Sequence, residues 1–357
     1  MATCEAITNP NTVWPPMCPN IAAAYFYAVL FGLVFITHIV QMFWSRKPYC
    51  WVICVSAGMQ TAAYILRVLS IQHVTNANYY TYWFILMMVS QVLQQSVLWR
   101  VTSRSPTLLP QIAPIWTNAF AYMVMGRMVY NFTHTASVFK LPAWHFGLLF
   151  VLLDVFAFLV QAAGASMASG GASVKLAMLG IHVYMGGIGF QQLCIFAFLA
   201  LATRLHLHLR RQSADTEERR TAFRLLYVEY AVVILITVRI IFRLIEYSSG
   251  INSSIPQHEV YQYVFDSTLM LFALVAFNVF HPGFMMPGNE ANMPKRKARK
   301  ALKRQGQTVS GRAAEYVALD EPKGVASQEG PDDVEQGYDY DGHGSDEEMI
   351  AGEEARS

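Results

Sequence analysis

Ionisable side chains recur at helical spacing in an apolar stretch between residues 231 and 247. Arg239, Arg243 and Glu246 stand at positions i, i+4 and i+7, so one face of a helix would carry all three. A charge inside a bilayer costs roughly 2.5–3.5 kcal/mol on insertion scales, and such residues usually pair with one another or line a cavity. The spacing therefore indicates a polar stripe that faces other parts of the protein.

A second apolar stretch, residues 261–280, carries a matching stripe that is rich in carboxylates. Glu259, Tyr263 and Asp266 repeat the same spacing. If the polar link between the two stretches is a short turn outside the membrane, Arg239 and Asp266 each lie about seven residues inside a helix, roughly 10 Å deep. The two stripes predict a buried polar site in which arginines meet carboxylates. Ion pairs that only lock the two helices together are the alternative interpretation.

Three further polar residues could extend this site. Asp154 is mid-span, roughly 15–18 Å from either membrane face by helical rise, so its carboxyl group must be neutral, paired or exposed to water. Gln161, seven residues later, shares its helical face. Asp154 could carry a proton for coupling, or it could be a structural residue with satisfied hydrogen bonds. Arg67, near the outer end of its helix, could join the arginine–carboxylate site or anchor the helix at the interface.

The elements that hold these residues are predicted to be transmembrane helices. The 357-residue chain is 54% hydrophobic and 14% charged, and apolar runs of about 20 residues, the length that crosses a bilayer, recur along it. The predicted fold class is therefore all-α, a polytopic membrane protein with seven transmembrane helices. The predicted spans are Ala22–Phe43, Cys50–Ser70, Ile112–Tyr130, Ala143–Gly164, Leu176–Thr203, Leu225–Tyr247 and Glu259–Phe280.

Arginine and lysine sort to alternate loops, which predicts the orientation. The first connection has Arg46 and Lys47, and the loop between residues 204 and 224 has six arginines. The alternate loops have only Lys175 when Val89–Gln111, which contains Arg100 and Arg104, is set aside. The positive-inside rule then gives an extracytoplasmic N-terminal tail (residues 1–21), a membrane domain (residues 22–283) and a cytoplasmic C-terminus. Residues 284–357 are predicted to be a disordered tail, basic at first and then acidic.

One apolar run, Tyr79–Trp99, does not fit this orientation, because an eighth span would move the basic loops outside. Removing Val89–Gln111 leaves one continuous span. The ends of that segment could be encoded by codons that resemble the borders of an intron, which suggests a retained intron. A real insertion that forms a polar loop or a broken helix is the alternative.

The N-terminal tail and the last outer loop carry candidate modification sites. Cys4 and Cys18 could form a disulfide if the tail is extracytoplasmic. Asn252 begins an Asn-Ser-Ser glycosylation acceptor, which the predicted orientation places outside.

Motifs for enzymatic chemistry are not found in the sequence. It has no GxxxxGK[ST] phosphate-binding run and no GxSxG nucleophile turn. His38 and His182 lack a second ligand at i+3 or i+4, so no metal site is expected. The sequence thus predicts a non-enzyme without a cofactor or a nucleic-acid partner.

The combined motifs resemble those of the fungal lipid-translocating exporters, seven-span proteins linked to aminocholesterol and long-chain-base resistance. The fourth and fifth spans match at Asp154, Gln161, Gly164, Gly180, Gly187 and Gln191. The last two spans match at Arg239, Arg243, Glu246, Gly250, Glu259, Tyr263 and Asp266, followed by His281–Gly283. The second span departs from the family pattern, because Gln60 and Ala63 replace an acidic residue and a glycine.

This resemblance implies a multi-pass protein of the plasma membrane or a related membrane that exports an amphiphile and confers resistance to it. The expected partner is a sphingoid base, a sterol-like compound or a toxic lipid. The arginine–carboxylate site would meet the polar head, and Asp154, Gln161 and Gln191 would serve further along the path. A seven-span receptor or lipid-stress sensor without transport activity is the alternative.

Overall fold

The structure is a computed structural model, and all of the residues that it describes belong to one compact unit, Met1–Ala318. The described residues are 9–12, 18–76, 78–79, 82, 113–139, 141–168, 174–211, 217–248, 258–288, 290–294, 296–305 and 311–312. The suspected insertion, Val89–Gln111, lies outside the described residues, as do Cys4 and Asn252. Cys18 is disulfide-bonded, and its pairing with Cys4 stays a prediction.

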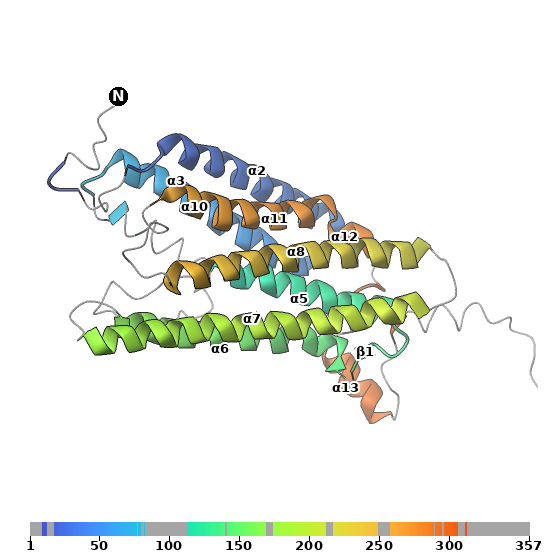
Figure 1. The fold of residues 1–357 in the computed structure, drawn as a ribbon. Helices are drawn as coiled ribbons and strands as arrows, with labels where there is room; N and C mark the ends of the chain where they lie inside the picture. Colours follow the sequence, from blue (N-terminus) through green and yellow to red (C-terminus); the bar gives the residue numbers. More distant parts are fainter. Residues whose placement is uncertain are drawn as a thin grey trace, which may run out of the picture. The chain divides into compact units, whose positions relative to one another are not determined.

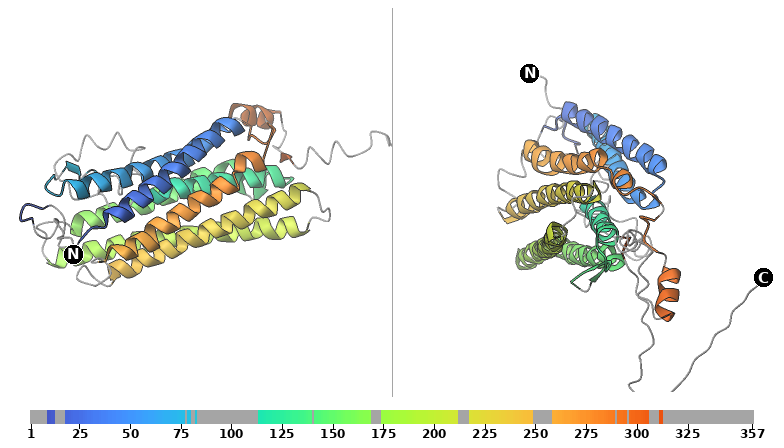
Figure 2. Two further views of the ribbon diagram at one scale, coloured as in Figure 1. Left: turned by 90° about the horizontal axis from the view of Figure 1, so that it is seen from above. Right: turned by 90° about the vertical axis from the view of Figure 1, so that its right-hand side faces the viewer.

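Long helices arranged as a bundle make up the described structure, and consecutive long helices run in opposite directions (Figures 1 and 2). The long helices are α2 (Ile21–Ser45), α3 (Trp51–Gln72), α5 (Ala113–Phe132), α6 (Ala143–Ala168), α7 (Val174–Arg211), α8 (Glu217–Ser248) and α11 (Leu269–Val279). Shorter elements are the 3₁₀ turn η1 (Pro48–Cys50), the strands β1 (Ser137–Val138) and β2 (Leu141–Pro142), and the helices α10 (Glu259–Gln262), α12 (Pro282–Met285) and α13 (Arg296–Arg304). The segment η2 (Tyr263–Thr268), between α10 and α11, is a π-helix.

Six of the described helical segments are long and apolar enough to cross a membrane. They are Ile21–Ser45, Pro48–Gln72, Ala143–Met167, Lys175–Arg211, Glu217–Glu246 and Glu259–Met285. The all-helical fold is thus as predicted, and six of the seven predicted spans have a matching candidate. The count of seven stays a prediction.

Helix α5 corresponds to the remaining predicted span, but its composition is more polar. It carries Asn118, Arg127 and Asn131, and it packs against α3, α6, α7, α8 and α11. Phe120, Met125 and other apolar side chains between these polar residues are fully buried. A helix enclosed by other helices can keep polar residues that a lipid-facing helix would not tolerate. The central position of α5 in the bundle therefore explains how a predicted transmembrane helix can tolerate this low hydropathy.

Close contact at glycine holds α6 against α7. A Cβ atom on Gly164 would lie 2.4 Å from the backbone nitrogen of Tyr184, and one on Gly187 would lie 2.6 Å from Cγ of Gln161. Small residues at such positions let two transmembrane helices approach closely and gain van der Waals contact. Gly164 and Gly187 thus have a packing role, and the close approach at Gly187 also fixes the position of Gln161.

The folded part of the chain extends beyond the predicted domain boundary at residue 283. Lys47 Nζ donates hydrogen bonds to the Gly288 carbonyl at 2.6 Å and to Asn292 Oδ1 at 3.3 Å. Burial, together with the charges of Arg127 and Arg312, lowers the pKa of Lys47. The segment after α12 therefore packs on the basic end of the bundle. It supplies hydrogen-bond acceptors for Lys47, a buried lysine in the connection between α2 and α3. Composition alone did not show this pairing.

Candidate functional site

The arginines of α8 meet the carboxylates of the last span inside the bundle. Asp266 accepts a hydrogen bond from Arg239 Nε with one oxygen and from Arg243 Nη2, at 2.8 Å, with the other. Arg243 Nη1 also donates to Glu246 Oε2 at 2.9 Å. Arg239 is 7% exposed and Asp266 is 6% exposed. The structure thus brings together four of the residues that the two stripes identify; we call them the inner ion network.

Local helix geometry explains how these groups reach one another. On α8, the i, i+4 and i+7 spacing places Arg239, Arg243 and Glu246 on one face. On the other side, Asp266 belongs to the π-helix η2, where Thr268 Oγ1 donates to the Tyr263 carbonyl at 2.8 Å. A π-helical turn shifts the side chains that follow it relative to an α-helix, and such turns are frequent at functional sites. Sequence spacing predicted the meeting of the stripes but not this turn.

A second ionic group joins Arg67, near the end of α3, to Glu259, at the start of the last span. Glu259 precedes Asp266 by seven residues, about two helical turns. Arg67 Nη2 contacts Glu259 Oε1, and Arg67 Nη1 donates to Gln262 Oε1 at 3.4 Å. The other oxygen of Glu259 accepts from the backbone N–H of Asn20 at 2.8 Å. The Arg67 guanidinium also lies 5.0 Å from the ring centroid of Tyr263. We call Arg67, Glu259, Gln262 and Asn20 the end ion pair.

Tyrosines connect the two groups. Tyr64 is hydrogen-bonded to Ser267, next to Asp266, and lies within electrostatic range of Asp266 and Arg67. The Tyr27 ring stacks on Tyr64 and on Tyr263, with centroid distances of 5.4 and 5.2 Å. The result is a continuous layer of hydroxyls, rings and charges across α2, α3, η2 and α8. Such a layer offers both cation–π and charge-assisted contacts to a polar head group.

Asp154 is placed apart from the ion network, in the middle of α6. Its Oδ2 accepts hydrogen bonds from Asn118 Nδ2 and from the Tyr122 hydroxyl, both at 3.1 Å. Its Oδ1 is buried without a hydrogen-bond partner, and the residue is 1% exposed. Among the described residues, no ion pair joins Asp154 to an arginine. The structure therefore does not bring Asp154 into direct contact with the arginines of the predicted site.

The two glutamines of the predicted site do contact each other. Gln161 Nε2 donates to Gln191 Oε1 at 3.3 Å, between α6 and α7. Tyr184, on α7, acts electrostatically on the Arg239 guanidinium. The glutamine pair thus belongs to the α6–α7 contact, and no hydrogen bond between described residues joins it to the inner ion network.

Glu229 is a buried carboxyl group that sequence reasoning missed. It lies on α8, its exposed fraction is 0%, and neither of its carboxyl oxygens has a hydrogen-bond partner in the described part of the chain. Glu229 and Asp154 both act electrostatically on the Tyr122 hydroxyl, and only Asp154 is hydrogen-bonded to it. A glutamate inside the predicted span Leu225–Tyr247 was the available signal. We call Asp154, Tyr122 and Glu229 the carboxyl pair site.

Metal binding has no support in the described ranges, where no three histidine, cysteine, aspartate or glutamate residues gather as ligands. The site combines buried ion pairs, stacked tyrosines and two carboxyl groups that have no cation partner in the part of the chain that the structure describes. Together with six apolar helices of membrane-spanning length, these features define a multi-pass helical membrane protein with polar groups inside the bundle. Such groups in transmembrane segments typically mark a substrate, ion or proton path.

Comparison with known proteins gives the particular family. Residues 101–289 match the model of the RTA1-like protein family, and the chain belongs to that family. The predicted resemblance to lipid-translocating exporters is thereby confirmed. The match includes every residue of the inner ion network, the carboxyl pair site and the glutamine pair.

Named relatives come from two fungi. The chain is 34% identical over 303 residues to the probable lipid transporter atnI of Emericella nidulans, covering 79% of this chain and 72% of the relative. It is 22% identical over 327 residues to the sphingoid long-chain base transporter RSB1 of Saccharomyces cerevisiae, covering 81% and 78%. It is 30% identical over 177 residues to the protoporphyrin uptake protein 1 of Saccharomyces cerevisiae, covering 48% and 56%. No solved structure matches the chain.

Proposed function

We propose that this protein moves an amphiphile with a charged head group across the bilayer, and that the inner ion network receives the head. The observation that carries this proposal is the position of Asp266, which is buried inside the bundle and shared by Arg239 and Arg243. Because two guanidinium groups share one carboxylate, a charged head group can take the place of one partner in this network. Relatives named as lipid and sphingoid base transporters support the same class.

The proposed topology has seven spans with the N-terminus outside, and α5 is the span that hydropathy alone does not reveal. Helix alternation in Figure 1 supports this arrangement. Basic residues gather where α2, α7 and α13 end, from Arg46 and Lys47 to Arg211 and Arg296–Arg304, and positive charge favours the cytoplasmic side. The inner ion network and the end ion pair lie toward the opposite end. In this orientation they face the outer leaflet, and the plasma membrane is the proposed location.

We favour a cationic head, such as the amine of a long-chain base, as the ligand. An ammonium group is a compact donor that can replace one arginine on Asp266 or Glu246, whereas an anionic head would have to displace the carboxylate from both arginines. The stacked rings of Tyr27, Tyr64 and Tyr263 would add cation–π contact to such a head. A phosphate head would select the arginines instead, and competition between the two lipid classes separates these cases.

The carboxyl pair site is the proposed coupling element. An apolar surrounding strongly favours the neutral form of a carboxyl group that has no cation partner. Asp154 and Glu229 would then each hold a proton, with Tyr122 between them as a hydroxyl that can donate and accept. Exchange of a proton for the cationic head would keep the buried charge constant. The sequence has no GxxxxGK[ST] phosphate-binding run, and an ion gradient, a downhill lipid path or another protein is the proposed driver.

Transport in purified vesicles tests this function. Full-length protein reconstituted in liposomes should move a fluorescent long-chain base between leaflets, and Asp266→Asn should reduce the rate at least tenfold, because a buried charged hydrogen bond contributes roughly 1.5–3 kcal/mol. Glu217→Gln is the matched control, since Glu217 is an exposed carboxylate on α8 with 69% side-chain exposure. Absence of movement by the wild-type protein, with altered expression of other transporters after gene deletion, would favour the sensor alternative.

A further inference from the structure

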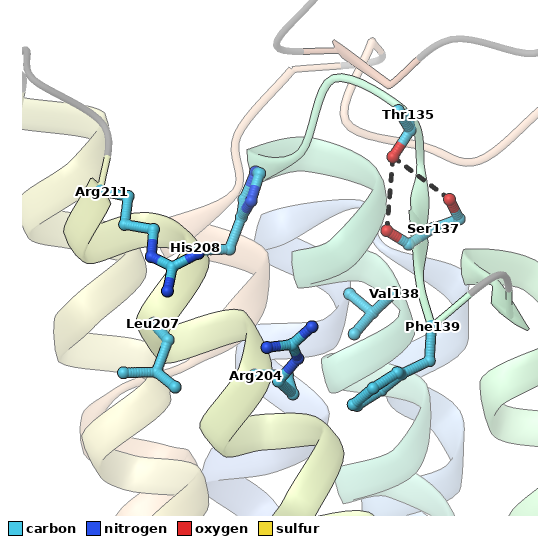
Figure 3. A pocket seen from close by; sticks show the side chains of 8 residues that line it. All are labelled: Thr135, Ser137, Val138, Phe139, Arg204, Leu207, His208 and Arg211. Carbon is cyan, nitrogen blue, oxygen red and sulfur yellow. Dashed lines mark hydrogen bonds between the residues drawn. The ribbon is translucent and has the colours of Figure 1, made fainter.

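A second polar site lies at the opposite, basic end of the bundle, where α7 passes the connection between α5 and α6. A cavity of about 200 Å³ opens there, and Figure 3 shows the eight side chains that line it. We call it the hairpin cavity. Its lining is Thr135, Ser137, Val138, Phe139, Arg204, Leu207, His208 and Arg211. None of these residues belongs to the ion network, the end ion pair or the carboxyl pair site.

Helix α7 supplies the charged wall of the cavity. Arg204, His208 and Arg211 stand at positions i, i+4 and i+7, so they share one face of the helix. At about 1.5 Å per residue the 38 residues of α7 extend about 57 Å, well beyond a hydrocarbon core of about 30 Å. The last turns of α7 therefore project from the bilayer core, and these three side chains lie at the level of lipid head groups.

The hairpin supplies the opposite wall. Strands β1 and β2 pair as Ser137 with Pro142 and Val138 with Leu141. The backbone at Ala136 and Phe139 has φ of 47° and 51°, in the left-handed region, where non-glycine residues are uncommon. This tight turn directs the Phe139 ring toward α7, where the Arg204 guanidinium lies 4.7 Å from its centroid. The hydroxyl of Ser137 is 3.1 Å from that of Thr135.

Charge in the cavity has one sign. Among the described residues, no carboxylate lines the cavity, and neither Arg204 nor Arg211 forms an ion pair. Two guanidinium groups and an imidazole are donors that can recognise phosphate, whereas the hydroxyl groups of Ser137 and Thr135 donate within the hairpin. The electrostatics thus favour an anionic ligand with several acceptor oxygens.

Apolar side chains beside these donors point to a lipid. Phe139 is 60% exposed and Leu207 is 41% exposed, and both line the cavity. Exposed apolar surface next to a basic pocket would gain nothing from a free phosphate ion, whereas a lipid places glycerol and acyl carbons against it. We propose that the hairpin cavity binds the phosphate head group of an anionic phospholipid in the leaflet at the basic end of the bundle. This site is separate from the proposed transport path.

Native mass spectrometry of the full-length protein with phosphatidic acid tests the proposal. Arg204→Gln and Arg211→Gln should each weaken binding about fivefold, and the double variant about 25-fold, because one basic residue near an anionic lipid contributes about 1 kcal/mol. Arg210→Gln is the matched control: Arg210 is an exposed neighbour that does not line the cavity, so binding should change less than twofold. Phosphatidylcholine should bind equally to all variants.

The apolar wall gives an independent readout. Leu207→Ser should weaken phosphatidic acid binding about fivefold, through loss of roughly 1 kcal/mol of apolar contact. Inorganic phosphate at millimolar concentration should not displace the lipid. Displacement by inorganic phosphate would show that the cavity binds a soluble anion and would overturn the lipid assignment. If Arg210→Gln and Arg204→Gln weakened phosphatidic acid binding equally, the site would be overturned, because binding would then depend on the general positive charge of the surface.

Discussion

The bundle contains two kinds of buried ionisable group, and they differ in their partners. In the inner ion network, Asp266 has two arginine partners. In the carboxyl pair site, Asp154 and Glu229 have no cation partner, and three of their four oxygens have no hydrogen-bond partner among the described residues. Paired charges depend on one another, because removing one partner leaves the other uncompensated. If Asp154 and Glu229 are neutral, as we propose, they carry no such dependence and could exchange a proton.

The largest expected effect comes from breaking the inner ion network. Asp266→Asn should lower the free energy of unfolding by about 3–5 kcal/mol, because it leaves Arg239 buried as an uncompensated cation. Chemical denaturation in detergent, followed by tryptophan fluorescence, measures the change. Glu217→Gln, at the exposed control position, should change the same quantity by less than about 0.5 kcal/mol. Equal stability of the Asp266→Asn and wild-type proteins would show that the network is not ionised.

Breaking the end ion pair should also lower the free energy of unfolding, but by less than breaking the inner ion network. Glu259→Gln should cost about 2–3 kcal/mol, because its side chain is 10% exposed and Gln262 remains as a second acceptor for Arg67. The exchanged double variant, Arg67→Glu with Glu259→Arg, should recover part of the loss, since a coupling energy belongs to the pair. A double variant that loses the sum of both single effects would contradict the pairing.

Sequence spacing predicted the paired region better than the unpaired one, for a physical reason. Opposite charges at i, i+4 and i+7 on two adjacent apolar stretches have few ways to be satisfied other than by each other, so the contact of Arg239 with Asp266 follows from the pattern. The π-helix η2 could not be predicted, because it depends on how Tyr64 and Tyr27 pack against Ser267 and Thr268.

Unpaired residues gave a weaker signal. Asp154 was noticed because it is mid-span, but its partners Asn118 and Tyr122 come from α5, whose packing the sequence does not specify. Glu229 has no partner that a spacing rule could have revealed. The helical class and most spans followed from hydropathy, whereas α5 depends on burial by neighbouring helices. The packing of Gly288 on Lys47 and of Ala291 on Asn131 likewise depends on tertiary contacts.

A change at Gly187 tests how firmly the middle of the bundle is positioned. Gly187→Ala should cost about 1–3 kcal/mol, because its Cβ would lie 2.6 Å from Gln161 Cγ and 3.0 Å from the Ala157 carbonyl oxygen. Gly186→Ala is the matched control, since a Cβ there meets nothing within 4 Å. The control should be neutral or slightly stabilising through helix propensity. Equal effects at the two glycines would show that α6 and α7 are loosely packed.

The smallest expected effect on stability comes from changes in the carboxyl pair site, and it tests whether this site differs from the inner ion network. Asp154→Asn and Glu229→Gln replace neutral carboxyl groups with amides of the same shape, so each should change the free energy of unfolding by less than about 1 kcal/mol. In the Asp154→Asn variant, the amide oxygen could still accept hydrogen bonds from Asn118 and Tyr122. Transport that depends on a proton gradient should nevertheless be lost, because an amide cannot release a proton. Denaturation and gradient-driven lipid movement in liposomes measure the two outcomes separately. A loss of stability as large as that of Asp266→Asn would mean that these carboxyl groups are ionised and paired, and the distinction between the two regions would no longer hold.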